Sequence, residues 1–111
     1  MDESVIEHLE RTTREMDEAS KLLLKAAQLI EDGGLARGLL RDGSSFCVVG
    51  AITYVAFGKT LPLFDRRAWG CPAIQKLRHA IGGGDSQMVV WNNGSRADEV
   101  ISTLRRVALG G

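Results

Sequence analysis

The feature that most constrains the fold is a run of twelve residues without a charge, from Phe46 to Phe57. It is preceded by Ser44 and Ser45, whose hydroxyl groups can cap a helix by accepting backbone N–H groups. Gly58 can end that helix, because glycine tolerates the left-handed conformation that closes a last turn. A helix that is apolar on nearly every face belongs in the centre of a domain. We therefore predict a buried helix here, with the rest of the chain packed around it.

Size and composition fit one small globular domain. The chain has 111 residues, of which 44% are hydrophobic and 25% charged. Its 14 basic and 14 acidic residues cancel, which argues against a protein that binds nucleic acid by neutralising phosphates. The apolar run is too short to cross a bilayer, and the first residues lack a signal-peptide pattern. We therefore expect a cytoplasmic protein with neither a membrane nor a nucleic-acid partner.

The first thirty residues carry a helical seam. Apolar or small residues recur there at alternating spacings of three and four, at Ile6, Leu9, Thr13, Met16, Ser20, Leu23, Ala27 and Ile30. One continuous helix over 2–32 would be about 45 Å long, which is long for so small a domain. Either the helix is broken near Thr12-Thr13, or its first half extends toward a partner. The plainer alternative is a helix that packs on its own core.

We divide the chain on this basis. Residues 1–15 are predicted to be a helical extension, and 16–111 a single helical domain. The extension is expected to mediate self-association, plausibly as a homodimer. The predicted interface residues are Ile6, Leu9, Met16 and Leu23.

Local signals divide the remainder of the chain. Gly33-Gly34 should end the first helix and Asp42-Gly43 should form a turn, with a short helical turn or a packed loop between them. Residues 59–69 are expected to be an irregular connection whose apolar side chains tuck against the core, although an exposed patch there would mark an interface. Those side chains are Leu61, Leu63, Phe64 and Trp69.

Two more helices are expected in the last forty residues. Pro72 suits the first position of one helix, and Ser95 is predicted to cap the last. Between them, 86–91 is predicted to be a short extended segment or buried loop, followed by a turn at Asn92-Asn93-Gly94. The predicted fold is therefore mainly all-α: a compact bundle of about four helices, with a long N-terminal helix and one short irregular or extended segment.

One set of residues resembles a catalytic constellation. Cys47, His79 and Asn92 follow in the chain order of Cys-His-Asn hydrolases, and a helix dipole could lower the thiol pKa of Cys47. However, a cysteine among apolar neighbours more often behaves as a small hydrophobic side chain. We expect Cys47 and Cys71 to be free thiols, no metal-ligand spacing, no cofactor and no enzymatic activity.

A second set suggests ligand binding. Trp91 offers an aromatic face and one donor, Asn92 and Asn93 offer amides, and Arg96 follows closely. Such a group can hold a nucleotide or a peptide. In the structural alternative, Trp91 fills the core and the asparagine pair caps its own turn.

Several stretches occur in an informative order: Leu22 to Gly33, then Cys47-x-x-Gly50-Ala51, then Trp91-Asn92-Asn93 before a helix with Glu99-Val100-Ile101 and Leu104. Together they resemble an uncharacterised family of small proteins from actinobacteria and their phages. The resemblance covers roughly 16–109. This sequence departs from the family pattern at Asn93, where Asp is usual, and at Arg96-Ala97, where Arg-Thr is common. The resemblance implies a setting but no activity.

Three functional hypotheses follow. The leading one is a non-enzymatic interaction module, plausibly a phage or actinobacterial accessory protein that binds a host protein and self-associates through its N-terminal helix. The alternative is a small-ligand, nucleotide-like binding protein that uses the Trp91-Asn92 turn. The third is a cysteine hydrolase.

Overall fold

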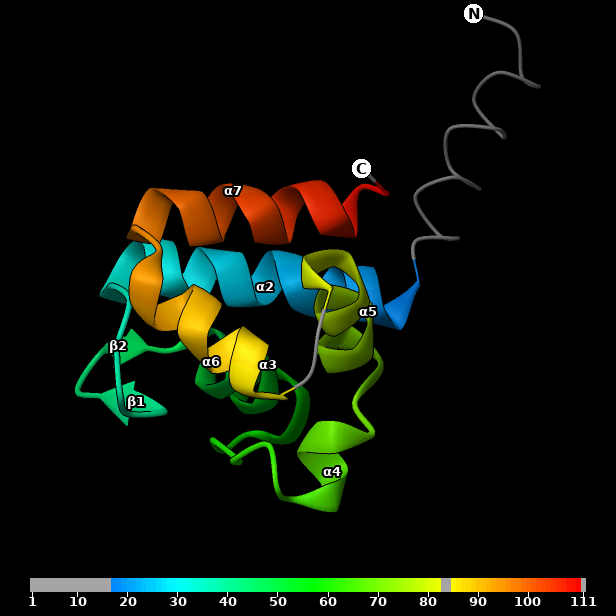
Figure 1. Cartoon of the computed structure of the whole chain (residues 1–111), viewed down its shortest axis with the longest axis horizontal. Helices are drawn as coiled ribbons and strands as arrows, with labels where there is room; N and C mark the ends of the chain where they lie inside the picture. Colours follow the sequence, from blue (N-terminus) through cyan, green and yellow to red (C-terminus); the bar gives the residue numbers. More distant parts are fainter. Residues whose placement is uncertain (1–16, 83–84, 111) are drawn as a thin grey trace, which may run out of the picture.

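Helix α2 (Glu18–Gly33) is the element against which most of the others pack. The computed structural model describes residues 17–82 and 85–110. In Figure 1, α7 (Ala97–Ala108) lies alongside α2 and runs antiparallel to it. Helices α3 (Val48–Phe57) and α5 (Pro72–Ile81) also contact α2. The described residues thus form a helical bundle that shares one core.

Helix α2 begins and ends on local signals. The Asp17 carboxylate accepts the backbone N–H of Ser20 at 2.7 Å, so it caps the first turn. Gly34, at φ 100°, ends the helix as the sequence predicts. The backbone of Asp17 is extended (φ −68°, ψ 163°), so of the two alternatives for 2–32 a single continuous helix is excluded. The break expected near Thr12-Thr13 lies outside the described residues. Residues 1–15, the predicted extension, lie outside the described residues.

A small hairpin follows α2. Strands β1 (Arg41–Asp42) and β2 (Ser45–Phe46) pair antiparallel across a turn in which Gly43 has φ 62°, so the predicted turn is confirmed. Phe46 ties the hairpin to the end of α2, because its N–H donates to Gly34 O and its carbonyl accepts the N–H of Ala36. The stretch between α2 and β1 is therefore a packed loop rather than a helical turn.

Helix α3 is the predicted buried helix, but the other helices pack mainly against α2 rather than around α3, which corrects its predicted central place. Its first half is fully buried, and Gly58 ends it at φ 79° as expected. The predicted serine cap is wrong, because Ser45 belongs to the hairpin and the helix is capped by Cys47 instead. The helix does not begin at Ser44 or Ser45 because the hairpin pairs with the end of α2. This contact between residues distant in sequence overrides the local serine signal.

The connection to the next helix contains a single helical turn, α4 (Arg66–Trp69), capped by Asp65. Pro72 occupies the start of α5 as predicted. The Arg78 guanidinium stacks on the Trp69 ring at 4.2 Å, which fixes α4 against α5.

The segment predicted to be extended is a helix, α6 (Asp85–Gly94), which is the main correction to the sequence analysis. Met88 and Asn92, one turn apart, are buried, whereas Val89 and Val90 between them are exposed. The alternation therefore has a helical period. Helix α7 starts one residue later than predicted, with Arg96 rather than Ser95 at its cap and no side-chain cap bond.

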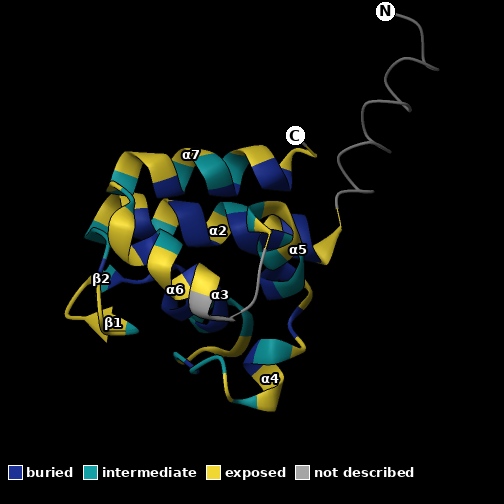
Figure 2. Ribbon diagram, viewed as in Figure 1, coloured by how far each residue is buried: buried dark blue, intermediate teal, exposed yellow. Residues whose placement is uncertain are grey.

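The all-α prediction is confirmed. Figure 2 shows the buried residues facing one another between α2, α3, α5 and α7. The largest fully buried side chains include Leu23, Ile30, Ile52, Ile74 and Leu104. Within the described ranges, no helix has both the length and the apolarity needed to cross a membrane.

Candidate functional site

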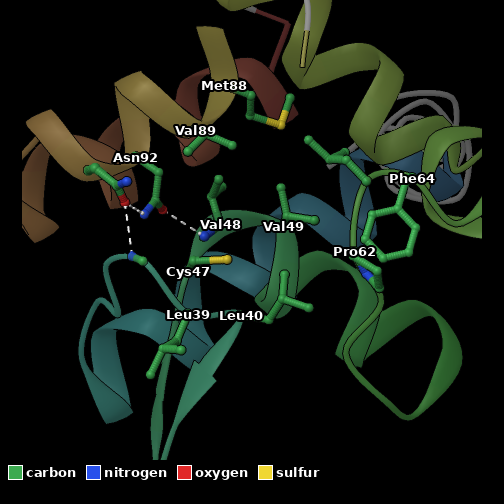
Figure 3. Close-up of a pocket in the computed structure, with 13 residues that line it drawn as sticks. Leu39, Leu40, Cys47, Val48, Val49, Pro62, Phe64, Met88, Val89 and Asn92 are labelled. Carbon is green, nitrogen blue, oxygen red and sulfur yellow. Dashed lines mark hydrogen bonds between the residues drawn. The ribbon is translucent and has the colours of Figure 1, made fainter. Parts of the chain in front are cut away.

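An apolar groove of about 460 Å³ opens at the N-terminal end of α3. Four separate stretches form its walls, and Figure 3 shows their side chains around one hollow. Its volume is in the range that holds a small molecule or several side chains of a partner. The lining residues are Gly38, Leu39, Leu40, Cys47, Val48, Val49, Pro62, Leu63, Phe64, Met88, Val89, Asn92 and Asn93.

Three large apolar side chains of this groove lie open to solvent. Phe64 is 90% exposed, Leu39 58% and Val89 48%. Isolated exposed apolar residues are ordinary, but three around one apolar hollow form a patch. The predicted burial of Phe64 is therefore wrong, and the structure has the exposed apolar patch of the alternative.

The exposure of Phe64 follows from its neighbours. Leu61 is buried and its N–H donates to the Thr53 hydroxyl at 2.9 Å, which anchors the start of the connection. The N–H of Asp65 donates to Pro62 O, which closes a turn just before α4. Phe64 lies in this turn between two fixed points, and its side chain projects outward at the groove (Figure 3).

Cys47 lines the groove, and Gly50 holds it in place from behind. The Cys47 N–H donates to Leu40 O, and its Sγ accepts the N–H of Gly50 at 3.2 Å. A Cβ on Gly50 would lie 1.9 Å from Leu40 O, so only glycine permits this close approach. Burial raises the pKa of the Cys47 thiol, although N–H groups of the helix N-terminus act in the opposite direction. The lowering expected from the helix N-terminus is therefore outweighed by burial.

Asn92 joins three parts of the structure. Its Oδ1 accepts the Val48 N–H at 2.8 Å, and its Nδ2 donates to Asn93 Oδ1 at 3.1 Å (Figure 3). The same Nδ2 also donates to Ala36 O at 3.0 Å. The side chain is 3% exposed. Asn92 therefore satisfies one of the unpaired N–H groups at the start of α3, from a position 44 residues away in sequence.

The other predicted ligand residues differ in burial and contacts. Trp91 is half-buried against the core. Asn93 lies at the groove rim, where its Oδ1 accepts the N–H of Gly38 at 3.3 Å. Arg96 is exposed and bound to Asp98 at 2.8 Å. The asparagine pair therefore bonds to other parts of the chain and does not cap its own turn.

The predicted hydrolase residues are only partly brought together. Cys47 and Asn92 both line the groove. His79 is exposed on α5 and lines a different hollow, beside Gln75 and Arg78. Both cysteines are free and buried. In the part of the chain that the structure describes, no three potential metal ligands of the His, Cys, Asp and Glu types cluster.

Of the four predicted interface residues, the structure describes only Leu23. Ile6, Leu9 and Met16 lie outside the described residues. Leu23 is fully buried in the core of α2 and has no surface to offer a partner, which corrects the prediction for this residue.

The groove itself was not predicted from the sequence. A usable signal existed, because Leu39-Leu40 follows a glycine and Leu63-Phe64 follows a proline, so large apolar residues stand in turns. That signal shows apolar loops but not that they meet.

Residues 14–109 match the model of a family described as "Family of unknown function (DUF6197)", and the chain belongs to that family. This agrees with the resemblance to an uncharacterised family. No curated protein and no solved structure matches the chain.

Proposed function

We propose that this chain is a non-enzymatic protein-binding module whose groove receives the apolar face of a partner helix. The observation that carries the proposal is the exposure of Phe64, Leu39 and Val89 around one apolar hollow. An amphipathic helix presents side chains at spacings of three and four, which is how such grooves are commonly filled. A partner that covers these three side chains buries apolar surface that the isolated domain leaves in water.

The burial is large enough to matter for affinity. Completely covering one Val, Leu or Phe side chain contributes about 1.5–3 kcal/mol. Because the three side chains at the groove are already partly covered, we expect about 4 kcal/mol from them together. Micromolar binding corresponds to about 8 kcal/mol, so this patch would supply roughly half and the groove floor and rim contacts the remainder.

The groove suits a peptide better than a nucleotide. A nucleotide site needs donors or cations directed at the ligand. Among the described residues, the only polar side chains in the lining besides the Cys47 thiol are Asn92 and Asn93. Both Nδ2 hydrogens of Asn92 are already used inside the protein.

We further propose a biological setting for the module. The resemblance to actinobacterial and phage proteins supports a cytoplasmic accessory protein that binds a host protein. The helical seam of the first sixteen residues supports self-association.

A peptide selection tests the groove. Sixteen-residue helical peptides from a displayed library would be enriched on the folded full-length protein and then measured by fluorescence anisotropy. Val89 and Val90 provide a matched pair, because both are exposed and neighbours on α6 but only Val89 lines the groove. We expect the peptides to bind Val90→Asp like the native chain and Val89→Asp about tenfold or more weakly. Equal binding to both variants would contradict the proposal.

A further inference from the structure

The sequence of this chain contains a candidate partner for the groove. Resting on the proposed function of the groove, we propose that in the absence of another partner it binds the acidic N-terminal segment, residues 2–16, of a second copy of this chain. Each copy then donates its segment and receives the other's.

Charge is the first observation that supports this pairing. The whole chain is neutral, but residues 1–16 contain five acidic residues and two arginines, so the segment has a side-chain charge of −3. The remainder therefore carries +3. The positive excess is concentrated in 34–70, which contains five basic and two acidic residues. Three of the four stretches that line the groove belong to this region.

Those cations are available to an acidic partner. Among the described residues, the only salt bridge within 34–70 joins Arg67 to Asp65 at 3.0 Å. Arg41 stacks over the Phe46 ring, and the Arg37 guanidinium donates to a backbone carbonyl. Lys59 and Arg66 flank the exposed connection that carries Phe64. A negatively charged segment that approaches the groove would meet more cations than carboxylates in the region that supplies three of its four walls.

The apolar pattern is the second observation. Ile6, Leu9 and Met16 recur at helical spacing with Val5 beside them, whereas Glu3, Glu7 and Glu10 fall outside this seam. The segment thus pairs an apolar stripe with acidic flanks, and region 34–70 combines three walls of the apolar groove with an excess of cations.

Geometry selects the second copy over the chain's own segment. The groove adjoins the far end of α2, because Phe46 bonds to Gly34 and the next residue, Cys47, lines the groove. Helix α2 spans about 24 Å between Asp17 and that end. A segment bound in helical form would extend about 16 Å over the stretch from Ile6 to Asp17, which is less than the length of α2, so in that form it suits the groove of a second copy. In a reciprocal exchange, each of the two copies fills the groove of the other, and the dimer is symmetric.

Complementation between two variants tests the exchange. The dissociation constant of the full-length dimer would be measured by sedimentation equilibrium for Val89→Asp, which damages the groove, and Ile6→Asp, which damages the segment. We expect each to weaken the dimer about tenfold or more. Val90→Asp and Ser4→Asp are the matched controls, because they add the same charge away from the groove and the seam, and should stay within about twofold.

An equal mixture of Val89→Asp and Ile6→Asp gives the decisive result. Such a heterodimer keeps one intact segment and one intact groove, so it should associate more tightly than either variant alone. Raising the salt concentration should weaken the native dimer, because the contact is partly electrostatic. Circular dichroism checks that each variant is folded, and Phe64→Ser serves as the groove variant if Val89→Asp is not.

Three outcomes would overturn the inference. Sensitivity to Ile6→Asp but not to the groove variants would indicate that the segments pair with each other. A mixture that fails to recover association, or a native chain that stays monomeric, would equally refute the exchange. None of these affects the proposed function, because selected peptides that discriminate Val89→Asp from Val90→Asp would still show that the groove binds a helix.

Discussion

Replacing Asn92 by alanine should destabilise the protein far more than the same change at its neighbour Asn93. The substitution removes the acceptor of the Val48 N–H and the donor to Ala36 O, and both of these bonds are buried. A buried backbone group left without a partner costs about 1–3 kcal/mol. Two such groups give a loss of about 4 kcal/mol, from a total that for a domain of this size is about 5–15 kcal/mol.

Urea unfolding followed by circular dichroism at the helical minimum measures this loss. With a slope of about 2 kcal/mol/M, the midpoint for Asn92→Ala should fall by about 2 M. Asn93→Ala is the matched control, because this exposed neighbour accepts from Gly38 at 3.3 Å and should cost about 1 kcal/mol or less.

The comparison has a clear failing result. If Asn92→Ala lowered the free energy of unfolding by no more than Asn93→Ala does, the hydrogen bonds of Asn92 to Val48 and Ala36 would not be what joins α6 to α3 and to the loop after α2. The assignment of a structural role to the Trp91-Asn92-Asn93 motif would then fail, and its role as a ligand site would need to be reopened.

Three further changes test other parts of the same framework. Gly50→Ala should lower the thermal midpoint sharply, because its Cβ would lie 1.9 Å from a backbone oxygen, whereas Gly94→Ala, with nothing within 4 Å, should be neutral or slightly stabilising. The Cys47 thiol, whose pKa is raised by burial, should react with iodoacetamide more slowly than free cysteine near pH 8. Mass spectrometry of the modified peptide measures this rate, and a faster reaction than that of free cysteine would contradict the prediction. The pKa of Asp17 is lowered mainly by the Ser20 N–H. The ionised carboxylate therefore stabilises the folded protein above the ordinary pKa of 3.8, and this contribution is lost as pH falls through the lower pKa of the folded state. Asp17→Asn should keep the cap and flatten the acid side of the calorimetric stability curve; an unchanged slope would refute this cause.

Elements defined by local signals were predictable from the sequence. The apolar stripe of α2, the proline at the start of α5 and the glycine after α3 each act within a turn or two of their own position. The fold class follows from these elements, since amphipathic helices around one apolar helix have few other ways to bury their faces.

Helix α6 shows where local signals fail. Asn92-Asn93-Gly94 is a good turn sequence in isolation. In the folded chain, Asn92 reaches Val48, and Met88 enters the core one turn earlier. These contacts select the helical period over the local turn preference. Such a choice depends on a neighbour 44 residues away, which no short window contains.

The groove was unpredictable for a related reason. Each of its four walls contributes only a few residues, and none carries a recognisable motif for binding. The residues that do form motifs, Cys47, Gly50 and Asn92, hold the walls in place. The sequence therefore marks the framework more clearly than the surface that the framework supports.

This division of roles also determines what the groove can select. A helix N-terminus beside a hollow would ordinarily attract an anion through its free N–H groups. At α3, however, the N–H of Val48 is bound by Asn92 and the N–H of Gly50 by the Cys47 sulfur. The floor of the groove is left apolar. If the proposed exchange is correct, a partner is recognised by an apolar face that enters the groove, and its acidic residues lie beside that face rather than within it.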